Sequence, residues 1–220
     1  MKQRDGRGGK IKVISLSVDL EKKDIIIIGG GKTAEKRAKV FHREKARITI
    51  VSPTVTEDLQ QLIKDGGIRW WNRCFKPDDV TAAFLLVIAT EDQDTNDRIA
   101  MLAGDVPLVN RADGGKGGNL HIPAQFSRGK LNVSVTTQGA SPKLASRLRA
   151  EWEKQFPPAY KEYVDFLYEC RQMLKTSSLS RAEKDRYLER MLDPSYLERE
   201  KQSIIKEEIH NKGGARICRD

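Results

Sequence analysis

Cysteine and histidine are scarce in this 220-residue chain, and long apolar runs are missing. The three cysteines, Cys74, Cys170 and Cys218, stand far apart without a C-x-x-C spacing, which argues against a disulfide framework or a structural zinc site. The three histidines show no metal-ligand spacing with one another or with cysteine, so we expect no protein-bound metal. The cysteines also lack an adjacent histidine or lysine, and we expect their thiols to be inert.

The apolar run at residues 84–89 is short, and even with Ala82 and Ala83 before it the run stays far below the about 20 apolar residues that a membrane-spanning helix needs. The polar start "MKQRDGRGGK" is not followed by the apolar segment of a secretory signal. We therefore expect an unexported, cytoplasmic protein with no membrane partner.

The net charge of +9 favours an anionic partner, which leaves nucleic acid, a membrane surface or an acidic small molecule open. Basic residues alternate with acidic ones along helical stretches such as "RAEKDRYLER", as on an ordinary solvated surface. No basic patch interleaved with aromatic residues points to nucleic acid, and we expect no such partner.

Five apolar segments alternate with amphipathic stretches in the first half of the chain. They cover residues 24–28, 47–51, 68–71, 84–89 and 106–110. This alternation predicts a mostly parallel sheet with helices on both faces, an α/β domain that binds its ligands at the carboxyl ends of the strands.

The pattern changes near residue 114. The segment "LNVSVTTQ" predicts an alternating strand, and "SPKLASRLRAEWEKQF" predicts a helix with Leu144, Leu148 and Trp152 on one face. Ser141 followed by Pro142 is a typical helix start, because a serine side chain caps free N–H groups and proline is tolerated in the first turn. The remainder is charged and helical.

These changes divide the chain into five parts. We predict a polar tail at 1–10, a nucleotide-binding domain at 11–113, a small α+β region at 114–150, a helical domain at 151–195, and a charged helix or flexible tail at 196–220.

A glycine cluster directly after the first strand carries the first functional signal. In "IIIIGGGKTAEKRA", Gly29, Gly31 and Ala34 match G-x-G-x-x-A, in which the glycines permit the turn and the approach of a pyrophosphate, and the alanine lets helix pack on strand. The alternative is a merely tight strand-to-helix turn. The residues predicted to bind a dinucleotide here are Gly29, Gly30, Gly31, Lys32 and Thr33.

The ends of the second and fourth strands should border the same site. The second strand ends in Ser52 and Pro53, with no carboxylate before Glu57 to bind the adenosine ribose, so the spacing does not decide between NAD and NADP. The fourth strand ends in Thr90, on the side where a nicotinamide would lie. Equally, Thr90 and Asp94 have the residue types that start a helix.

The segment "VNRADGGKGGNLHIPA" places Asn110 and Asp113 after the last strand of the sheet, at the start of a run rich in glycine. An Asp-Gly pair is most often part of a turn, so the residues alone do not make Asp113 catalytic.

Four segments, "IIIIGGGKTAEKRA", "IATEDQDTN", "VNRADGGKGGNLHIPA" and "TTQGASPKLASRLR", together resemble the precorrin-2 dehydrogenase domain of sirohaem synthesis. This family occurs alone or as the amino-terminal half of a larger sirohaem synthase. The resemblance covers roughly residues 11–192 and implies a Rossmann-like sheet followed by a small α+β dimerisation domain and a helical C-terminal region.

The resemblance implies oxidation of precorrin-2 to sirohydrochlorin with NAD as cofactor. It makes Asp113 the expected general base and Asn110 and Ser141 expected substrate-binding residues. It also implies a homodimer, whose interface we expect at the segment from Asp113 to about Phe156, and a separate methyltransferase and a separate chelatase. Some members insert ferrous iron as well, and the sequence leaves that activity open.

Three features depart from the family. Arg111 and Ala112 stand where apolar residues are usual, and nothing after residue 195 matches. His121 replaces a commonly apolar residue, and we expect it to lie in a strand with a structural role. A non-catalytic NAD-sensing module of the ion-channel-gating type is the alternative, although such modules usually keep the acidic residue that this chain lacks after its second strand. Nucleic-acid binding rests on net charge alone.

Overall fold

The computed structural model describes residues 14–214, so the predicted polar tail at 1–10 and Cys218 lie outside the described residues. The chain divides into two compact units, the first ending at Ile122 and the second beginning at Pro123. This boundary lies later than the one expected near 114, because the intervening loop folds back onto the sheet. The backbone N–H groups of Asn119 and Leu120 both donate to the Val109 carbonyl, at 3.0 Å.

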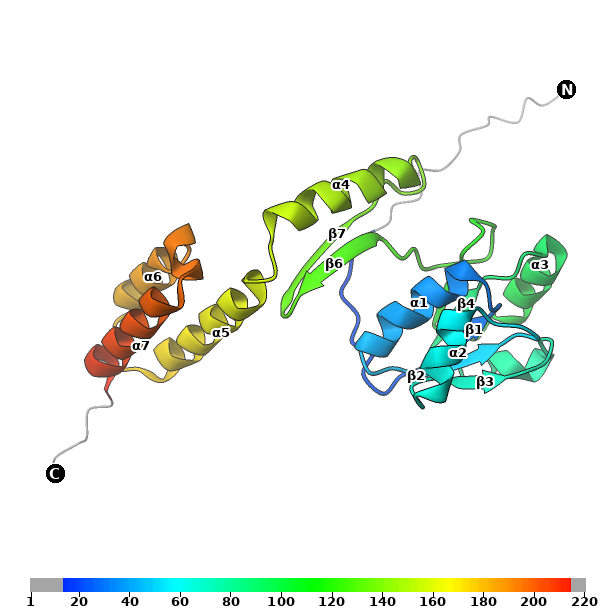
Figure 1. The fold of residues 1–220 in the computed structure, drawn as a ribbon, viewed down its shortest axis with the longest axis horizontal. Coiled ribbons are helices and arrows are strands. Elements are labelled where there is room, and N and C mark those ends of the chain that lie inside the picture. The colour runs from blue at the N-terminus through cyan, green and yellow to red at the C-terminus, as the bar shows by residue number, and fades with distance from the viewer. Residues whose placement is uncertain (1–13, 215–220) are drawn as a thin grey trace, which may run out of the picture. The chain divides into compact units, whose positions relative to one another are not determined.

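The first unit is built on a five-stranded parallel sheet in the order β3-β2-β1-β4-β5 (Figure 1). The strands are β1 (Asp24–Ile28), β2 (Arg47–Val51), β3 (Arg69–Trp71), β4 (Leu85–Ile88) and β5 (Leu108–Arg111). The strands β2 and β3 lie on one side of β1. After β3 the chain crosses to the other side of β1 and continues with β4 and β5, so the switch point of the sheet lies between β1 and β4. A crevice opens at the carboxyl ends of the strands at such a switch point.

Three helices cover the two faces of this sheet. They are α1 (Lys32–Arg43), α2 (Glu57–Lys64) and α3 (Gln93–Leu102), and a short 3-10 helix η1 (Pro77–Val80) precedes β4. Alternate isoleucines of β1 point to opposite faces: Ile25 and Ile27 pack with α1 and α2, whereas Ile26 and Ile28 pack with α3. Both faces are therefore buried, which confirms the α/β architecture expected from the continuous apolar strands.

The second unit begins with an antiparallel hairpin of β6 (Ala124–Arg128) and β7 (Leu131–Val135), of which only β7 was expected from the sequence. Helix α4 (Pro142–Gln155) follows and packs against both strands. The Ser141 side chain caps this helix by accepting a hydrogen bond from the Leu144 N–H at 3.2 Å, as its position before Pro142 predicts.

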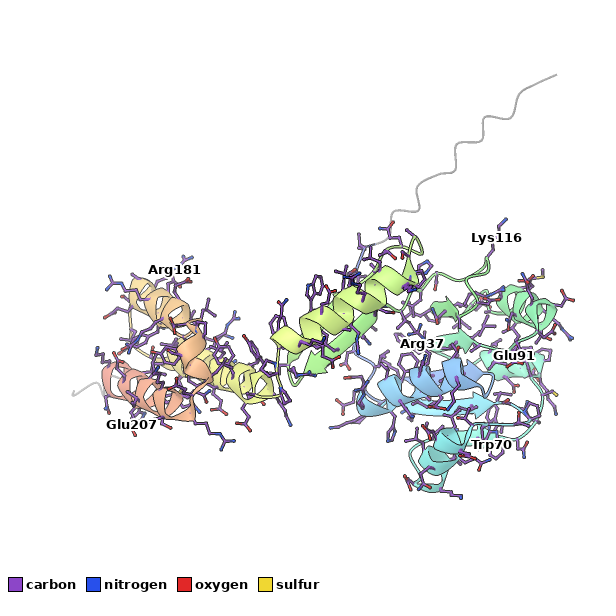
Figure 2. All side chains as sticks on the ribbon, turned by 45° about the horizontal axis from the view of Figure 1, so that its top comes forward. Arg37, Trp70, Glu91, Lys116, Arg181 and Glu207 are labelled. Carbon is purple, nitrogen blue, oxygen red and sulfur yellow. The ribbon has the colours of Figure 1, made fainter. Side chains whose placement is uncertain are left out.

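The last helices form a separate apolar cluster within the second unit. They are α5 (Tyr160–Thr176), α6 (Arg181–Arg190) and α7 (Arg199–Gly213), with a 3-10 helix η2 (Pro194–Leu197) before α7. Phe166 of α5 and Ile205 of α7 are buried in this cluster. Charged side chains such as Arg181 and Glu207 point outward (Figure 2). The sequence left a charged helix or a flexible tail open for residues 196–220. Residues 199–213 form a charged helix.

Cys170 lies in this cluster with no exposed surface. Burial raises the pKa of its thiol to about 11, so it is held protonated at neutral pH, in keeping with the inert role expected of it. Between residues 14 and 214, no helix has both the length and the apolar character needed to cross a membrane.

Candidate active site

The glycine turn after β1 is shaped by two close backbone approaches. Gly29 adopts φ +117°, and a Cβ there would lie 2.3 Å from the Ala89 carbonyl oxygen. A Cβ on Gly30 would lie 1.9 Å from the Thr54 carbonyl oxygen. Side chains are excluded at both positions, so these two glycines fix the shape of the turn between β1, β2 and β4.

Gly31 has a different role, because no atom lies within 4 Å of the place where its Cβ would be. It is the N-cap residue of α1, and the free N–H groups of the first helical turn begin there. Ala34, fully buried, brings the helix close to the sheet. The turn therefore offers open space in front of a helix N-terminus, the arrangement that suits a pyrophosphate.

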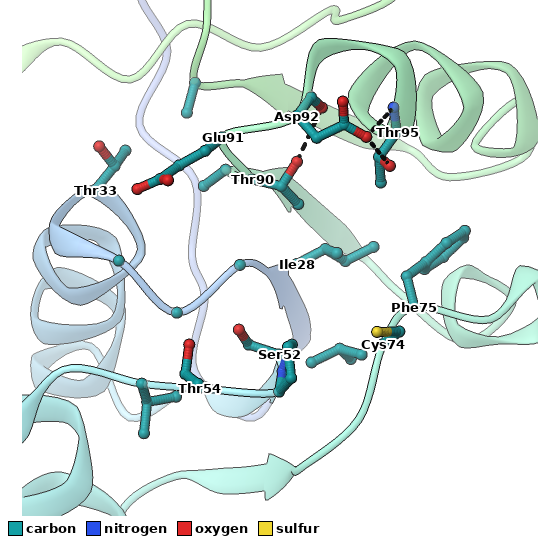
Figure 3. A pocket seen from close by; sticks show the side chains of 18 of the residues that line it. Ile28, Thr33, Ser52, Thr54, Cys74, Phe75, Thr90, Glu91, Asp92 and Thr95 are labelled. Carbon is teal, nitrogen blue, oxygen red and sulfur yellow. Dashed lines mark hydrogen bonds between the residues drawn. The ribbon is translucent and has the colours of Figure 1, made fainter.

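A cleft of about 1030 Å³ lies above this turn, at the carboxyl ends of the parallel strands (Figure 3). Every residue that the sequence predicted to bind the dinucleotide lines it: Gly29, Gly30, Gly31, Lys32, Thr33, Ser52, Pro53 and Thr90. Four residues that were not predicted from the sequence also line the cleft: Thr54, Cys74, Phe75 and Glu91. Their signal is positional, since each follows the end of a strand.

The wall after β2 carries hydroxyl groups in place of a carboxylate. Ser52 is 7% exposed, and its carbonyl accepts a hydrogen bond from the Trp70 ring N–H at 2.9 Å. The segment therefore meets the cleft through Ser52, Pro53 and Thr54.

Thr90 belongs to a polar network on the β4 side of the cleft. Its hydroxyl donates to the Asn96 side-chain carbonyl at 2.6 Å, and the Asn96 amide donates to the Asp113 carboxylate at 3.1 Å. Neither Thr90 nor Asp94 caps α3; the Asp92 side chain does, by accepting from the Thr95 N–H at 3.1 Å. Through Asn96, this network connects Thr90 at the cleft with Asp113 in the loop after β5.

Asp113 lines both the main cleft and a smaller cavity of about 330 Å³, and the two cavities also share Thr90 and Glu91. Arg111 donates to both Asp113 oxygens, from Nε at 2.9 Å and from Nη2 at 2.6 Å, and the Gly115 N–H adds a third bond at 3.1 Å. The Arg111 contact, reinforced by Gly115 and Asn96, holds the pKa of the Asp113 carboxyl far below its usual range. Asp113 is thus ionised whenever the protein is folded near neutral pH.

The remaining predicted site residues lie elsewhere. Asn110 is buried, lines neither cavity, and donates from its amide to the Leu120 carbonyl at 2.9 Å. Ser141 belongs to the second unit, so its role towards a ligand stays a prediction. The expectation that His121 lies in a strand is wrong: it is exposed in the loop before β6, because the chain there leaves the sheet.

The parallel sheet, the glycine turn at its switch point and the open start of α1 define a Rossmann-type NAD(P)-binding protein. Residues 16–124 match the family model "Putative NAD(P)-binding", and residues 160–205 match the "SirC C-terminal domain" model. The chain is 34% identical over 182 residues to precorrin-2 dehydrogenase of Priestia megaterium, covering 83% of this chain and 90% of that protein. It belongs to the precorrin-2 dehydrogenase family.

Other relatives agree. Precorrin-2 dehydrogenase of Bacillus subtilis is 35% identical over 159 residues, which cover 72% of this chain and 98% of that protein. "Siroheme synthase 3" of Aeromonas hydrophila is 29% identical over 174 residues, 79% of this chain but 37% of that protein. The solved structure of "SirC, precorrin-2 dehydrogenase" superposes with a TM-score of 0.76 at 32% identity, covering 90% of this chain and all of that one.

The match to the C-terminal model reaches residue 205 and includes the first part of α7. The expectation that nothing after residue 195 matches the family is therefore wrong. Between residues 14 and 214, no group of three or more His, Cys, Asp or Glu side chains is placed to hold a metal ion.

Proposed function

We propose that this protein is an NAD-dependent precorrin-2 dehydrogenase, which oxidises precorrin-2 to sirohydrochlorin in sirohaem biosynthesis. The observation that carries the proposal is the junction of two cavities. The dinucleotide cleft and the smaller cavity share Thr90, Glu91 and Asp113, so a cofactor and a substrate can meet beside the Asp113 carboxylate. The chain matches nearly the whole length of two precorrin-2 dehydrogenases, and this family membership supports the proposed oxidation.

The residues of the glycine turn fit the cofactor. The open space before Gly31 would admit the pyrophosphate, and the first N–H groups of α1 would donate to it. Ser52 and Pro53, at the end of β2, would border the adenosine side, and Thr90, at the end of β4, would border the nicotinamide side. When bound, NAD supplies the hydride acceptor.

Asp113 is the proposed general base. The oxidation removes two hydrogens from the macrocycle, one as a hydride that ends on NADH and one as a proton that Asp113 accepts. Because its carboxylate is ionised, it also stabilises the positive charge that develops on the macrocycle as the hydride leaves.

Recognition of the substrate is assigned to anion-binding groups. Precorrin-2 carries several carboxylates, which suit the excess of lysine and arginine and the N–H groups at the start of α4 beside Ser141. Asn110 stays a predicted substrate-binding residue, and its buried position favours a role in holding the loop after β5. The separate methyltransferase and chelatase and a cytoplasmic location stay predictions from the sequence, which leaves iron insertion open.

A homodimer is part of the proposal and rests on the second unit. The face of α4 expected to be apolar is not buried within the chain: Leu144 is 47% exposed, and Leu148 and Trp152 are half-buried. A two-stranded hairpin with one helix is a small base for an independent fold, so a second copy of the chain is the proposed cover for this face.

The test is anaerobic turnover. Purified protein given precorrin-2 and NAD is expected to form NADH and sirohydrochlorin in equal amounts. Asp113→Asn should lower kcat by about a hundred- to ten-thousand-fold, the usual worth of general-base help, while NAD affinity persists.

The matched control is Asp24→Asn, which removes another arginine-paired carboxylate at the amino end of β1, the opposite edge of the sheet from the cleft. Its turnover should stay near that of the wild type. NAD binding without any NADH from the wild type would favour the sensing module, and unchanged turnover in Asp113→Asn would remove this residue from the mechanism.

A further inference from the structure

Arg111 is a buried cation on β5 whose partners come from two other segments, α3 and the loop 113–118. Its side chain is 2% exposed at the end of β5. Besides the two bonds to Asp113, its Nη1 donates to the Asp97 carboxylate of α3 at 2.7 Å and to the Lys116 carbonyl at 3.0 Å. The guanidinium thus joins β5, α3 and the loop 113–118 through one planar group, which suits its fork of donors.

The loop around Arg111 is shaped to admit this side chain. A Cβ on Gly115 would lie 2.1 Å from Arg111 Nη2, although the backbone of Gly115 does not need a glycine conformation. A Cβ on Gly118 would lie 3.2 Å from Arg111 Cγ. Gly115 is therefore explained by the volume of the arginine side chain, whereas Gly118 also packs closely on the β5 backbone, with the Val109 carbonyl oxygen 3.1 Å from its Cβ position.

We propose that Arg111 is a positioning residue, which fixes the Asp113 carboxylate and the loop 113–118 against α3, so that Asp113 meets the substrate ionised and in one orientation. The bidentate contact sets the direction of the carboxylate, since both oxygens are held at once. The Asn96 amide holds the same carboxylate from α3, so rotation about the Asp113 side chain would break bonds on two sides.

The charges facing Asp113 come from several elements. From the loop before α3 and from α3 itself, Glu91, Asp92 and Arg98 line the same cleft, and Asp97 holds the far side of the Arg111 guanidinium. The side chain of Lys116 points away from the unit (Figure 2). Arg111 is the cation in direct contact, and it is the first cause of the lowered pKa of Asp113, against the opposing effect of burial.

The catalytic part of this inference rests on the proposed function, whereas the effect of Arg111 on Asp113 does not. The first measurement is therefore a carbon-13 titration of the Asp113 carboxyl downward from about pH 8, assigned by comparison with Asp113→Asn. Because the pKa of Asp113 lies far below its usual range, the wild-type signal should not titrate above about pH 3. In Arg111→Leu we expect a midpoint near the ordinary aspartate value of about 3.9, because a contacting arginine lowers an aspartate pKa by about one to three units. An Arg111→Leu signal that also fails to titrate above about pH 3 would overturn the proposal.

The second measurement is the pH dependence of turnover. Protonated Asp113 cannot accept a proton, so the acid limb of kcat/KM should move to higher pH in Arg111→Leu, with kcat lowered about a hundredfold by loss of orientation and NAD affinity retained. Arg111→Lys, which keeps a charge but not the fork, should show a smaller shift. A purely structural role would lower activity without moving the limb.

Arg47→Leu is the matched control, because Arg47 makes a bidentate contact with Asp24 at the amino ends of β1 and β2. This control should leave both the Asp113 titration and the acid limb of kcat/KM in place. A shift equal to that of Arg111→Leu would show that the effect comes from the net charge of the protein and not from the contact with Asp113. If Arg111→Leu does not fold, Gly115→Ala serves instead, since its Cβ displaces the guanidinium. It should raise the Asp113 midpoint, and an unchanged midpoint would again contradict the proposal.

Discussion

The two units differ in the kind of surface that is proposed to bind a partner. In the first unit, the apolar side chains are buried on both faces of the sheet, and the cleft is bordered by glycine backbone and hydroxyl groups. In the second unit, Leu144 and its neighbours on α4 leave apolar surface exposed. A polar cleft at strand ends suits a small charged molecule, whereas an apolar helix face suits another protein surface.

The largest expected effect follows from closing the cleft of the first unit. Gly31→Asp places a carboxylate where the pyrophosphate must approach, and we expect NAD affinity to fall about a hundredfold, because juxtaposed like charges cost several kcal/mol. Folding should be unaffected, since the space around a Cβ at this position is open. Calorimetric titration with NAD measures the affinity. Alkylation of exposed Cys74, which lines the cleft, should be slowed by NAD in the wild type and less in this variant.

Gly104→Asp is the control for this variant. Gly104 lies between α3 and β5, and a Cβ there also meets open space. The added charge is the same but sits away from the cleft, so NAD affinity should match that of the wild type. Equal affinities in all three proteins would show that the glycine turn does not hold the cofactor.

A smaller effect is expected from the exposed face of the second unit. Leu144→Asp should weaken self-association about tenfold or more, since truncated or charged anchors in an interface commonly cost over 1 kcal/mol. An acidic residue in the first turn of α4 favours the helix, so the change acts on association. Light scattering at micromolar concentration measures the mass.

Leu192→Asp is the comparison for the association experiment. Leu192 is 58% exposed and lies after α6, outside the segment 113–156 expected to form the interface. It should leave the dimer intact. A monomeric wild type, or equal weakening by both changes, would refute an α4 interface.

The smallest effect concerns how the first unit secures helix α1. Glu35 accepts hydrogen bonds from Lys39 at 2.9 Å, Thr56 at 2.8 Å and Lys32 at 3.0 Å, which together lower its pKa to about 2. Glu35→Gln should lower the free energy of unfolding by about 1 kcal/mol at neutral pH. Because the folded pKa is depressed, the difference should shrink as the pH falls from about 4.5 towards 2.

Denaturant unfolding of both proteins near pH 7 and near pH 3 measures this difference. Glu57→Gln, an exposed glutamate in the first turn of α2, is the control and should change stability little at either pH. A Glu35 effect that stays constant with pH would show that the carboxylate charge is not its source.

Local patterns in the sequence predicted the sheet and the cofactor cleft well. β1 and β2 have the bounds expected from their apolar runs, and the G-x-G-x-x-A spacing located the turn where Gly29 needs a positive φ. Strand β6 was missed because "AQFSR" buries a single apolar side chain, Phe126, and otherwise reads as polar loop. The unit boundary was placed too early because the return of Leu120 to β5 is a tertiary contact.

The surroundings of Asp113 were only partly accessible from the sequence. Residues two apart in an extended chain lie on the same side, so the spacing of Arg111 and Asp113 carried a signal for their contact. Asn96 and Asp97 come from α3, and no local pattern connects them to the loop after β5. The low pKa of Asp113 depends on this assembled environment. Residue type alone could predict only the turn in which Asp113 lies.

The close packing of Gly115 on Arg111 also constrains the order in which such a site can arise. A glycine at position 115 is compatible with a small residue at position 111, since nothing then needs the freed space. With an arginine at position 111, a Cβ at position 115 would lie 2.1 Å from the guanidinium and would displace it from Asp113. A path that introduces the glycine first and the arginine second therefore avoids this displacement, whereas reversion of the glycine would cost the contact once the arginine is present.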